Sequence, residues 1–169
     1  MIKTIIVDDE RLARNELKKL LKEFPEIEII EEAVNVQDAL EKIENLQPSL
    51  VFLDIQMPGG KTGFDLLEML EYTPNVVFTT AYNEFAIKAF EYNALDYLLK
   101  PIENKRLHDA IQKVKLHIEK KNNIIKDKLS LDDQVFVKDG ERCWFVKLNE
   151  VRLFESVGNY AKVFFGNNK

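Results

Sequence analysis

The sequence predicts an α/β fold in which a five-stranded parallel sheet is covered on both faces by helices and is followed by a short all-β fragment. Two patterns predict this fold. Across residues 1–118, short apolar runs alternate five times with segments whose apolar residues recur at helical spacing. Such alternation is typical of a doubly wound parallel sheet. Beyond residue 131 the period changes to two, which is typical of antiparallel strands.

The expected strands are short, mostly apolar segments, and in the second one apolar residues alternate with Glu28 and Glu32 over part of its length. The third is the clearest, because the run at 50–53 lies between Pro48 and Pro58 and is too short for a helix. The expected strands cover 2–7, 27–34, 50–53, 76–78 and 97–99. The expected helices lie around 12–24, 39–46, 64–70, 86–90 and 102–118.

Polar residues follow the strands at their carboxyl ends. In open α/β sheets, ligands bind outside these ends, where the strand order reverses. Periodicity alone does not fix the strand order, but the flavodoxin-like order 2-1-3-4-5 would place the first and third strands side by side. This order would gather five residues at one edge of the sheet: Asp8, Asp9, Asp54, Thr80 and Lys100.

The residues expected at this edge form a complete set for phosphoryl transfer. Three neighbouring carboxylates repel one another unless a cation lies among them, and carboxylate oxygens favour hard ions such as Mg²⁺. Such an ion could neutralise a phosphoryl group arriving at Asp54, which would act as an attacking carboxylate. Lys100 and Thr80 could supply the donors that the charged phosphoryl oxygens need.

Each of these residues, taken alone, has a simpler explanation. Asp8 or Asp9 could cap the N-terminus of the first helix. Thr80 could be an ordinary strand residue, and Lys100 a solvated side chain before Pro101. Their occurrence at successive strand ends is what favours a functional site.

The charge distribution, the cysteine content and the lack of long apolar runs limit the classes of protein to which the chain can belong. Residues 1–102 carry a net charge of −9, residues 103–131 of +4 and residues 132–169 of zero. An acidic first part suits a cation site and argues against contact with nucleic acid there. The single cysteine, Cys143, excludes an internal disulfide and fits a reducing compartment. No signal peptide and no apolar run of membrane-spanning length is visible, so we expect a cytoplasmic protein that does not bind a membrane.

Four motifs in this order resemble the receiver domain of bacterial two-component response regulators. Asp8 and Asp9 follow the first strand, and DIQMP at 54–58 follows the third. TAY at 80–82 follows the fourth strand, and DYLLKP at 96–101 covers the fifth. The resemblance extends over roughly the first 120 residues, and each motif lies in the expected strand context.

The resemblance implies a phosphoacceptor and a metal site. Asp54 would accept a phosphoryl group from a histidine kinase. Asp9, Asp54 and the backbone carbonyl of Gln56 would bind Mg²⁺, with Asp8 acting largely through water. The protein would then not be an enzyme, apart from self-catalysed phosphorylation and dephosphorylation.

The resemblance also implies a switch. Thr80 and Lys100 would contact the phosphoryl oxygens, and Tyr97 would move inward when Thr80 is drawn to the phosphate. Receiver pairs in this family often dimerise on phosphorylation, so a phosphorylation-dependent homodimer is a further expectation.

One loop departs from the family pattern. In the family, three residues usually separate the proline after the acceptor strand from the glycine at the next helix, whereas four lie between Pro58 and Gly63. Together with Gly59 and Gly60, Gly63 predicts a flexible loop before the third helix. The extra residue bears on the shape of the loop and the lifetime of the phosphoryl group, not on the acceptor.

The later part of the chain resembles the LytTR branch of these regulators. Residues 79–101 are similar to LytTR receivers, and residues 136–140 and 151–160 resemble the start of a LytTR DNA-binding domain. In that family the domain is an all-β unit that inserts loops into the DNA major groove. The expected organisation is a receiver domain over 1–119, a linker over 120–131 and an incomplete LytTR domain over 132–169.

Asn159 and Lys162 are the candidate DNA contacts, because they lie where the LytTR family places a DNA-facing loop. The alternative is that Asn159 only tolerates a left-handed turn. The 38 residues at 132–169 are few for a stable core and carry no net charge, which gives no electrostatic attraction to DNA. We therefore expect the full-length protein to bind DNA and this chain to bind it poorly or not at all.

Two other functions fit parts of the sequence. A receiver could act by binding protein partners without a DNA-binding output. A Mg²⁺-dependent phosphatase of the haloacid dehalogenase type also uses an aspartate nucleophile at a strand end. That class carries a second acid two residues after the nucleophile, and the glutamine at position 56 argues against it.

Overall fold

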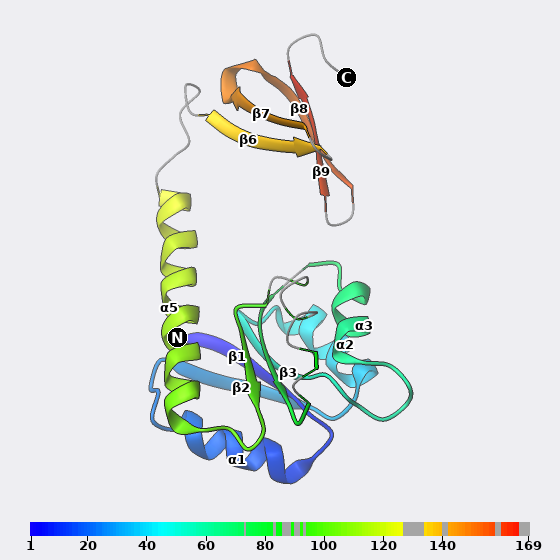
Figure 1. The fold of residues 1–169 in the computed structure, drawn as a ribbon, viewed down its shortest axis with the longest axis vertical. Helices are drawn as coiled ribbons and strands as arrows, with labels where there is room; N and C mark the ends of the chain where they lie inside the picture. Colours follow the sequence, from blue (N-terminus) through cyan, green and yellow to red (C-terminus); the bar gives the residue numbers. More distant parts are fainter. Residues whose placement is uncertain are drawn as a thin grey trace. The chain divides into compact units, whose positions relative to one another are not determined.

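A computed structural model describes residues 1–72, 74–82, 84–85, 89, 92, 94–126, 134–139, 142–157 and 160–165 (Figure 1). The chain divides into two compact units, Met1–Ile118 and Glu119–Lys169. Each unit is described by itself below.

The first unit is built on a five-stranded parallel sheet. Its strands are β1 (Ile2–Val7), β2 (Ile27–Ala33), β3 (Leu50–Asp54), β4 (Asn75–Thr80) and β5 (Asp96–Leu99). Their order in the sheet is β2-β1-β3-β4-β5, and every neighbouring pair is parallel. The flavodoxin-like order expected from the sequence is therefore confirmed, and β3 is the central strand.

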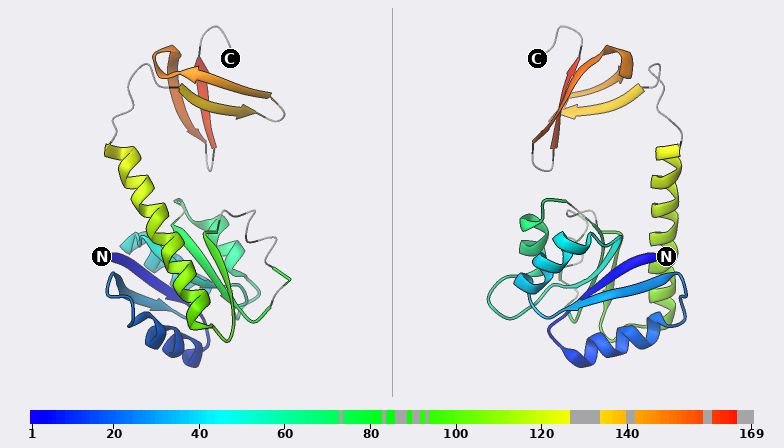
Figure 2. Two further views of the ribbon diagram at one scale, coloured as in Figure 1. Left: turned by 60° about the vertical axis from the view of Figure 1, so that its left-hand side comes forward. Right: turned by 180° about the vertical axis from the view of Figure 1, so that it is seen from behind.

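The helices divide between the two faces of the sheet. They are α1 (Arg11–Leu21), α2 (Val36–Leu46), α3 (Gly63–Met69) and α5 (Asn104–Lys126). The views of Figure 2 show α1 and α5 on one face and α2 and α3 on the other. Of the expected fourth helix, Ala86 and Phe90 lie outside the described residues, whereas Ala89 is helical and buried.

Two apolar clusters, one on each face, explain why the central strand β3 is apolar up to Asp54. On β3, Val51 and Leu53 contribute to the cluster under α2 and α3. The alternate residues Leu50 and Phe52 contribute to the cluster under α1 and α5. Successive side chains of a strand point to opposite faces, so a strand covered on both sides must be apolar at every position. All five residues of β3 are buried.

The last helix of the first unit is longer than the sequence predicts. We expected a linker over 120–131, but α5 continues to Lys126. The buried positions of α5 end at Val114, and Ile118 packs against the core while still partly exposed. Lysine and glutamate have high helix propensity, which favours further turns without a continuing apolar stripe. The helix therefore extends beyond Glu119 instead of ending there, and residues 127–131 lie outside the described residues. The division into receiver, linker and output domain stays a prediction.

The second unit contains two antiparallel strand pairs, as the change of period predicts. β6 (Gln134–Asp139) pairs with β7 (Arg142–Lys147), and Asp139 lies opposite Arg142. β8 (Val151–Val157) pairs with β9 (Tyr160–Phe165). β8 continues through Val157, and residues 158 and 159 lie outside the described residues. Within the described ranges of both units, no helix is long and apolar enough to cross a membrane.

Candidate functional site

An acidic cluster lies where β1 and β3 end side by side. Val7 of β1 is the register partner of Leu53 of β3, so the residues that follow them emerge together. One oxygen each of Asp8, Asp9 and Asp54 lies within 4.8 Å of the others. Asp8 and Asp54 are buried, whereas Asp9 is exposed. The three carboxylates predicted to meet at this edge of the sheet therefore do so.

Lys100 joins two of these carboxylates. It follows β5 directly, and its Nζ lies 2.6 Å from Asp54 Oδ2 and 2.7 Å from Asp8 Oδ2. Burial by itself would lower the pKa of Lys100, but the hydrogen bonds to Asp54 and Asp8 outweigh it and raise the pKa above its ordinary value. Lys100 therefore stays charged and partly offsets the repulsion within the cluster.

Burial makes the charged form of Asp54 less favourable than it is in water. Burial raises the pKa of the Asp54 carboxyl above its ordinary value, and nearby Asp8 adds to this rise. The hydrogen bond from Lys100 opposes the shift without reversing it. A buried carboxylate of this kind gains from any further cation that approaches it.

The loop after β1 is fixed by backbone contacts. Asp8 N donates to Ala33 O at 3.0 Å, and Glu10 N donates to Asp8 Oδ1 at 2.9 Å. The N-cap of α1 is Glu10, which makes no side-chain capping bond. The simpler explanation, that Asp8 or Asp9 serves only as the N-cap residue, does not hold.

The loop after β3 closes on itself. Gln56 and Thr62 form an isolated antiparallel bridge, and the turn between them uses Gly59 and Gly60 at φ values of +97° and +77°. Thr62 caps α3 in a capping box with Asp65. The longer loop therefore ends in a defined structure.

Gly63 belongs to α3 and not to the loop in which we had expected it. Its amide donates to Ile55 O at 2.8 Å. A Cβ at this position would lie 2.5 Å from Asp54 O and 3.0 Å from Leu53 Cγ. The glycine is needed because α3 begins against the backbone of β3.

The other expected site residues lie near this edge. Gln56 N donates to Asp54 Oδ1 at 3.3 Å, while its carbonyl as a metal ligand stays a prediction. Thr80 is buried at the end of β4, where its carbonyl accepts from Lys100 N at 2.8 Å. Tyr97 is partly buried, and its hydroxyl donates to the carbonyl of Tyr82. The proposed roles of Thr80 and Tyr97 as a switch stay predictions.

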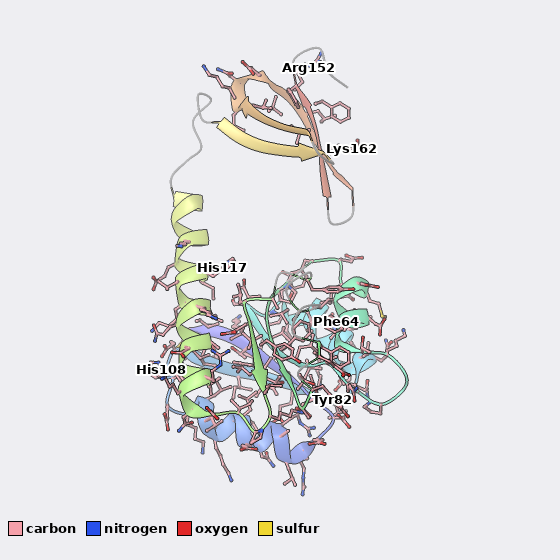
Figure 3. All side chains as sticks on the ribbon, viewed as in Figure 1. Phe64, Tyr82, His108, His117, Arg152 and Lys162 are labelled. Carbon is pink, nitrogen blue, oxygen red and sulfur yellow. The ribbon has the colours of Figure 1, made fainter. Side chains whose placement is uncertain are left out.

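Figure 3 labels the candidate DNA contact Lys162 on β9 and the two histidines of the chain on α5. Lys162 is exposed on β9 and is the register partner of Glu155, and Asn159 lies outside the described residues. Their role as DNA contacts stays a prediction. His108 and His117 are both exposed on α5, and the ring of His108 lies 5.4 Å from that of Phe24.

Two residues that shape the site were not identified from the sequence. Arg14 reaches from α1 to the backbone carbonyls of Asp8 and Asp9. An arginine on an amphipathic helix gives no sign in a single sequence that it turns inward. For Gly63, the unusual spacing after Pro58 drew attention to the segment but not to the close contact with Asp54.

The donor set fits a hard divalent cation. Carboxylate oxygens from two neighbouring strand ends converge, and one of the three carboxylates faces solvent. Mg²⁺ favours one or two carboxylates together with water, which this arrangement can provide. The acidic cluster could therefore bind Mg²⁺ through Asp8, Asp9 and Asp54.

Solved structures with this fold define the class of protein. The response regulatory domain of mrkE from Klebsiella pneumoniae superposes with a TM-score of 0.64 and 34% identity, covering 70% of this chain and 99% of that one. The REC domain of AraT from Geobacillus stearothermophilus gives a TM-score of 0.63 and 31% identity, covering 72% and 98%. The fold and its acidic edge are those of a signal receiver domain. Residues 4–112 match the family model of the response regulator receiver domain, and the chain belongs to this family.

Curated relatives extend the comparison. An uncharacterized response regulatory protein of Vibrio cholerae is 50% identical over 116 residues, which are 68% of this chain and 48% of that protein. The sensory transduction protein LytT of Bacillus cereus is 47% identical over 118 residues, with the same shares of the two chains. An uncharacterized response regulatory protein of Yersinia pestis is 41% identical over 158 residues, 92% of this chain and 66% of that protein. The chain thus spans about half the length of most of these relatives.

Proposed function

We propose that this chain is the receiver part of a response regulator, in which Asp54 accepts a phosphoryl group from a histidine kinase with the help of Mg²⁺. The observation that carries the proposal is the placement of Asp54. Its buried carboxylate contacts the Lys100 ammonium and lies in a group of three acids that can bind a cation. This arrangement places a nucleophile beside the positive charge of an ammonium group and beside the negative charges of two further carboxylates.

The transfer step follows from these positions. A carboxylate oxygen of Asp54 attacks the phosphorus of a phosphohistidine, the new P–O bond forms as the P–N bond breaks, and the histidine nitrogen leaves with the electron pair and takes up a proton. The Lys100 ammonium, which contacts Asp54 in this structure, is close enough to pair with an oxygen of the incoming group. A bound Mg²⁺ would neutralise further negative charge on that group.

A pocket beside the site suits a protein phosphodonor. It has a volume of about 340 Å³ and is lined by Asp8 and Lys100 together with apolar residues that include Leu12 and Ile102. Leu12 is 77% exposed on the first turn of α1. We propose that the protein carrying the phosphodonor contacts the apolar part of this lining. The kinase would place its phosphohistidine over Asp54 from this side.

The output that we propose is DNA binding by a LytTR-type domain, to which residues 132–169 would contribute. The Yersinia pestis relative supports this, since its similarity extends over 158 residues and therefore beyond the receiver. Relatives in Salmonella typhi and Staphylococcus haemolyticus are named a transcriptional regulatory protein and a sensory transduction protein. A phosphorylation-dependent homodimer and a cytoplasmic location belong to the same proposal. An output through protein binding alone is the second candidate.

Intact-mass spectrometry after incubation with Mg²⁺ and acetyl phosphate tests the proposed chemistry. We expect one phosphoryl adduct per chain, no adduct when a chelator removes Mg²⁺, and loss of the adduct in hydroxylamine, which cleaves acyl phosphates but not phosphate esters. A hydroxylamine-stable adduct would contradict an aspartyl acceptor. Specific, salt-sensitive gel shifts with this chain would contradict the expected lack of DNA binding.

Replacing Lys100 with methionine is expected to separate metal binding from transfer. The half-saturating Mg²⁺ concentration should fall, because the ammonium no longer competes for Asp8 Oδ2 and Asp54 Oδ2. The rate of phosphoryl transfer should fall by about 100-fold, the usual cost of losing one donor to a developing charge. Mg²⁺-dependent thermal unfolding and the growth of the adduct measure the two effects. Lys105→Met, at an exposed position of α5, is the matched control and should change neither.

A further inference from the structure

We propose that Arg14 is a positioning residue for the divalent cation, because its guanidinium fixes the backbone from which Asp8 and Asp9 project. The inference rests on the proposed function only in assuming that the acidic cluster binds Mg²⁺. It assigns a role to a residue that lies outside the motifs of the strand ends.

The contacts of Arg14 are directed at the backbone of the acidic loop. Its Nη1 donates to Asp8 O at 2.7 Å and to Asp9 O at 3.1 Å. The side chain is only 11% exposed, so few water molecules can replace these bonds. Two consecutive carbonyls held by one rigid group fix the orientation of the peptide between them. The directions in which the side chains of Asp8 and Asp9 leave the backbone are thereby set.

A third element, the strand β2, holds the guanidinium of Arg14 in place. Arg14 Nε lies 2.9 Å from Glu32 Oε2 on β2, and Lys18 Nζ lies 2.6 Å from Glu32 Oε1. Glu32 is the register partner of Ile6 on β1, the strand that leads into the acidic loop. Arg14 therefore connects α1, β2 and the end of β1 through one planar group. A lysine could not make the three contacts at once, because its ammonium is a compact charge without a fork.

A role through charge and a role through positioning predict opposite changes in Mg²⁺ affinity when Arg14 is replaced. A positive group near the cluster repels a cation, so a role through charge alone predicts tighter Mg²⁺ binding when the charge is removed. A positioning role predicts weaker binding after the same substitution, since the carboxylates lose their orientation. Residues that orient metal ligands typically contribute about 10- to 100-fold in metal affinity. The sign of the change therefore decides between the two roles.

The experiment measures Mg²⁺ binding by the full 169-residue chain without any phosphodonor. The midpoint of thermal unfolding is followed by circular dichroism across a Mg²⁺ titration, and the half-saturating concentration is read from the rise of the midpoint. For Arg14→Met and Arg14→Lys we expect this concentration to increase by about 10-fold or more. Lys18→Met is the matched control, because it removes a partner of Glu32 without touching the acidic loop, and it should match the wild type.

Each other outcome has a distinct meaning. A lower midpoint without Mg²⁺ but an unchanged half-saturating concentration in both Arg14 variants would show a purely structural role and overturn the inference. Tighter binding by Arg14→Met, with wild-type binding by Arg14→Lys, would overturn it in favour of charge. A wild-type chain that does not respond to Mg²⁺ would contradict the metal site of the proposed function, which is a different failure. If Arg14→Met does not fold, Arg14→Lys alone still separates positioning from charge.

Discussion

Asp54→Asn is expected to abolish the phosphoryl adduct. The amide has the shape of the carboxylate but no negative charge, so it cannot attack phosphorus at a useful rate. Lys100 would keep its ion pair with Asp8, so the surrounding site should keep its structure. We expect the adduct to fall to the background of a reaction without a phosphodonor. Intact-mass spectrometry under identical conditions measures the difference.

Asp96→Asn is the matched control for this substitution. Asp96 is also a buried carboxylate, with 7% of the residue exposed, and it pairs with Arg106 and Lys113. It lies at the first position of β5, whereas the acidic cluster follows the carboxyl ends of β1 and β3. The variant should still form the adduct, even if it unfolds more easily. An adduct that persists in Asp54→Asn and disappears in Asp96→Asn would place the acceptor elsewhere.

Gly63→Val is expected to disturb both the stability of the first unit and its chemistry. The Cβ would lie 2.5 Å from Asp54 O, so α3 or the end of β3 must move. Overpacking of this kind costs about 1–3 kcal/mol in the free energy of unfolding. A displacement of Asp54 by about 1 Å would slow transfer by about 100-fold. Denaturant unfolding followed by circular dichroism and the rate of adduct formation measure the two losses.

Gly60→Ala provides the comparison for Gly63→Val. An added Cβ at Gly60 meets nothing within 4 Å, but the φ of +77° strains any other residue. We expect a loss of about 1–2 kcal/mol from this strain and a rate of transfer much closer to that of the wild type. Equal rates of adduct formation in the two variants would show that the contact between Gly63 and Asp54 does not position the acceptor.

The sequence predicted those parts of the structure that local patterns determine. The central strand β3 is apolar up to Asp54 because both of its faces are covered, and this produces the short run that identified it. The acids at 8, 9 and 54 follow directly from those strands, so the strand order alone brings them together. The ion pairs of Lys100 with Asp8 and Asp54 confirm that the end of β5 belongs to the same edge.

The features that were missed depend on contacts between distant parts of the chain. Arg14 and Glu32 are 18 residues apart, and a polar residue on a helix is usually a solvated one. The contact of Gly63 with Asp54 depends on how α3 packs against β3, and the spacing of apolar residues in the sequence does not predict this packing. The end of α5 was missed for a different reason. We predicted the end of the helix from the point where the apolar spacing stops. The charged residues beyond that point have high helix propensity, which favours further helical turns.

The position of β3 in the sheet has a mechanical consequence. It is the central strand, held by β1 on one side and by β4 on the other, and the start of α3 rests on its last carbonyl. A strand bonded along both edges is stiff, so a group attached to Asp54 is anchored to the part of the unit least able to yield. In the proposed function, the displacement that carries a signal would then occur in the side chains and strand ends around Asp54. Structures of the two states, superposed on β1 and β3, would show those displacements directly.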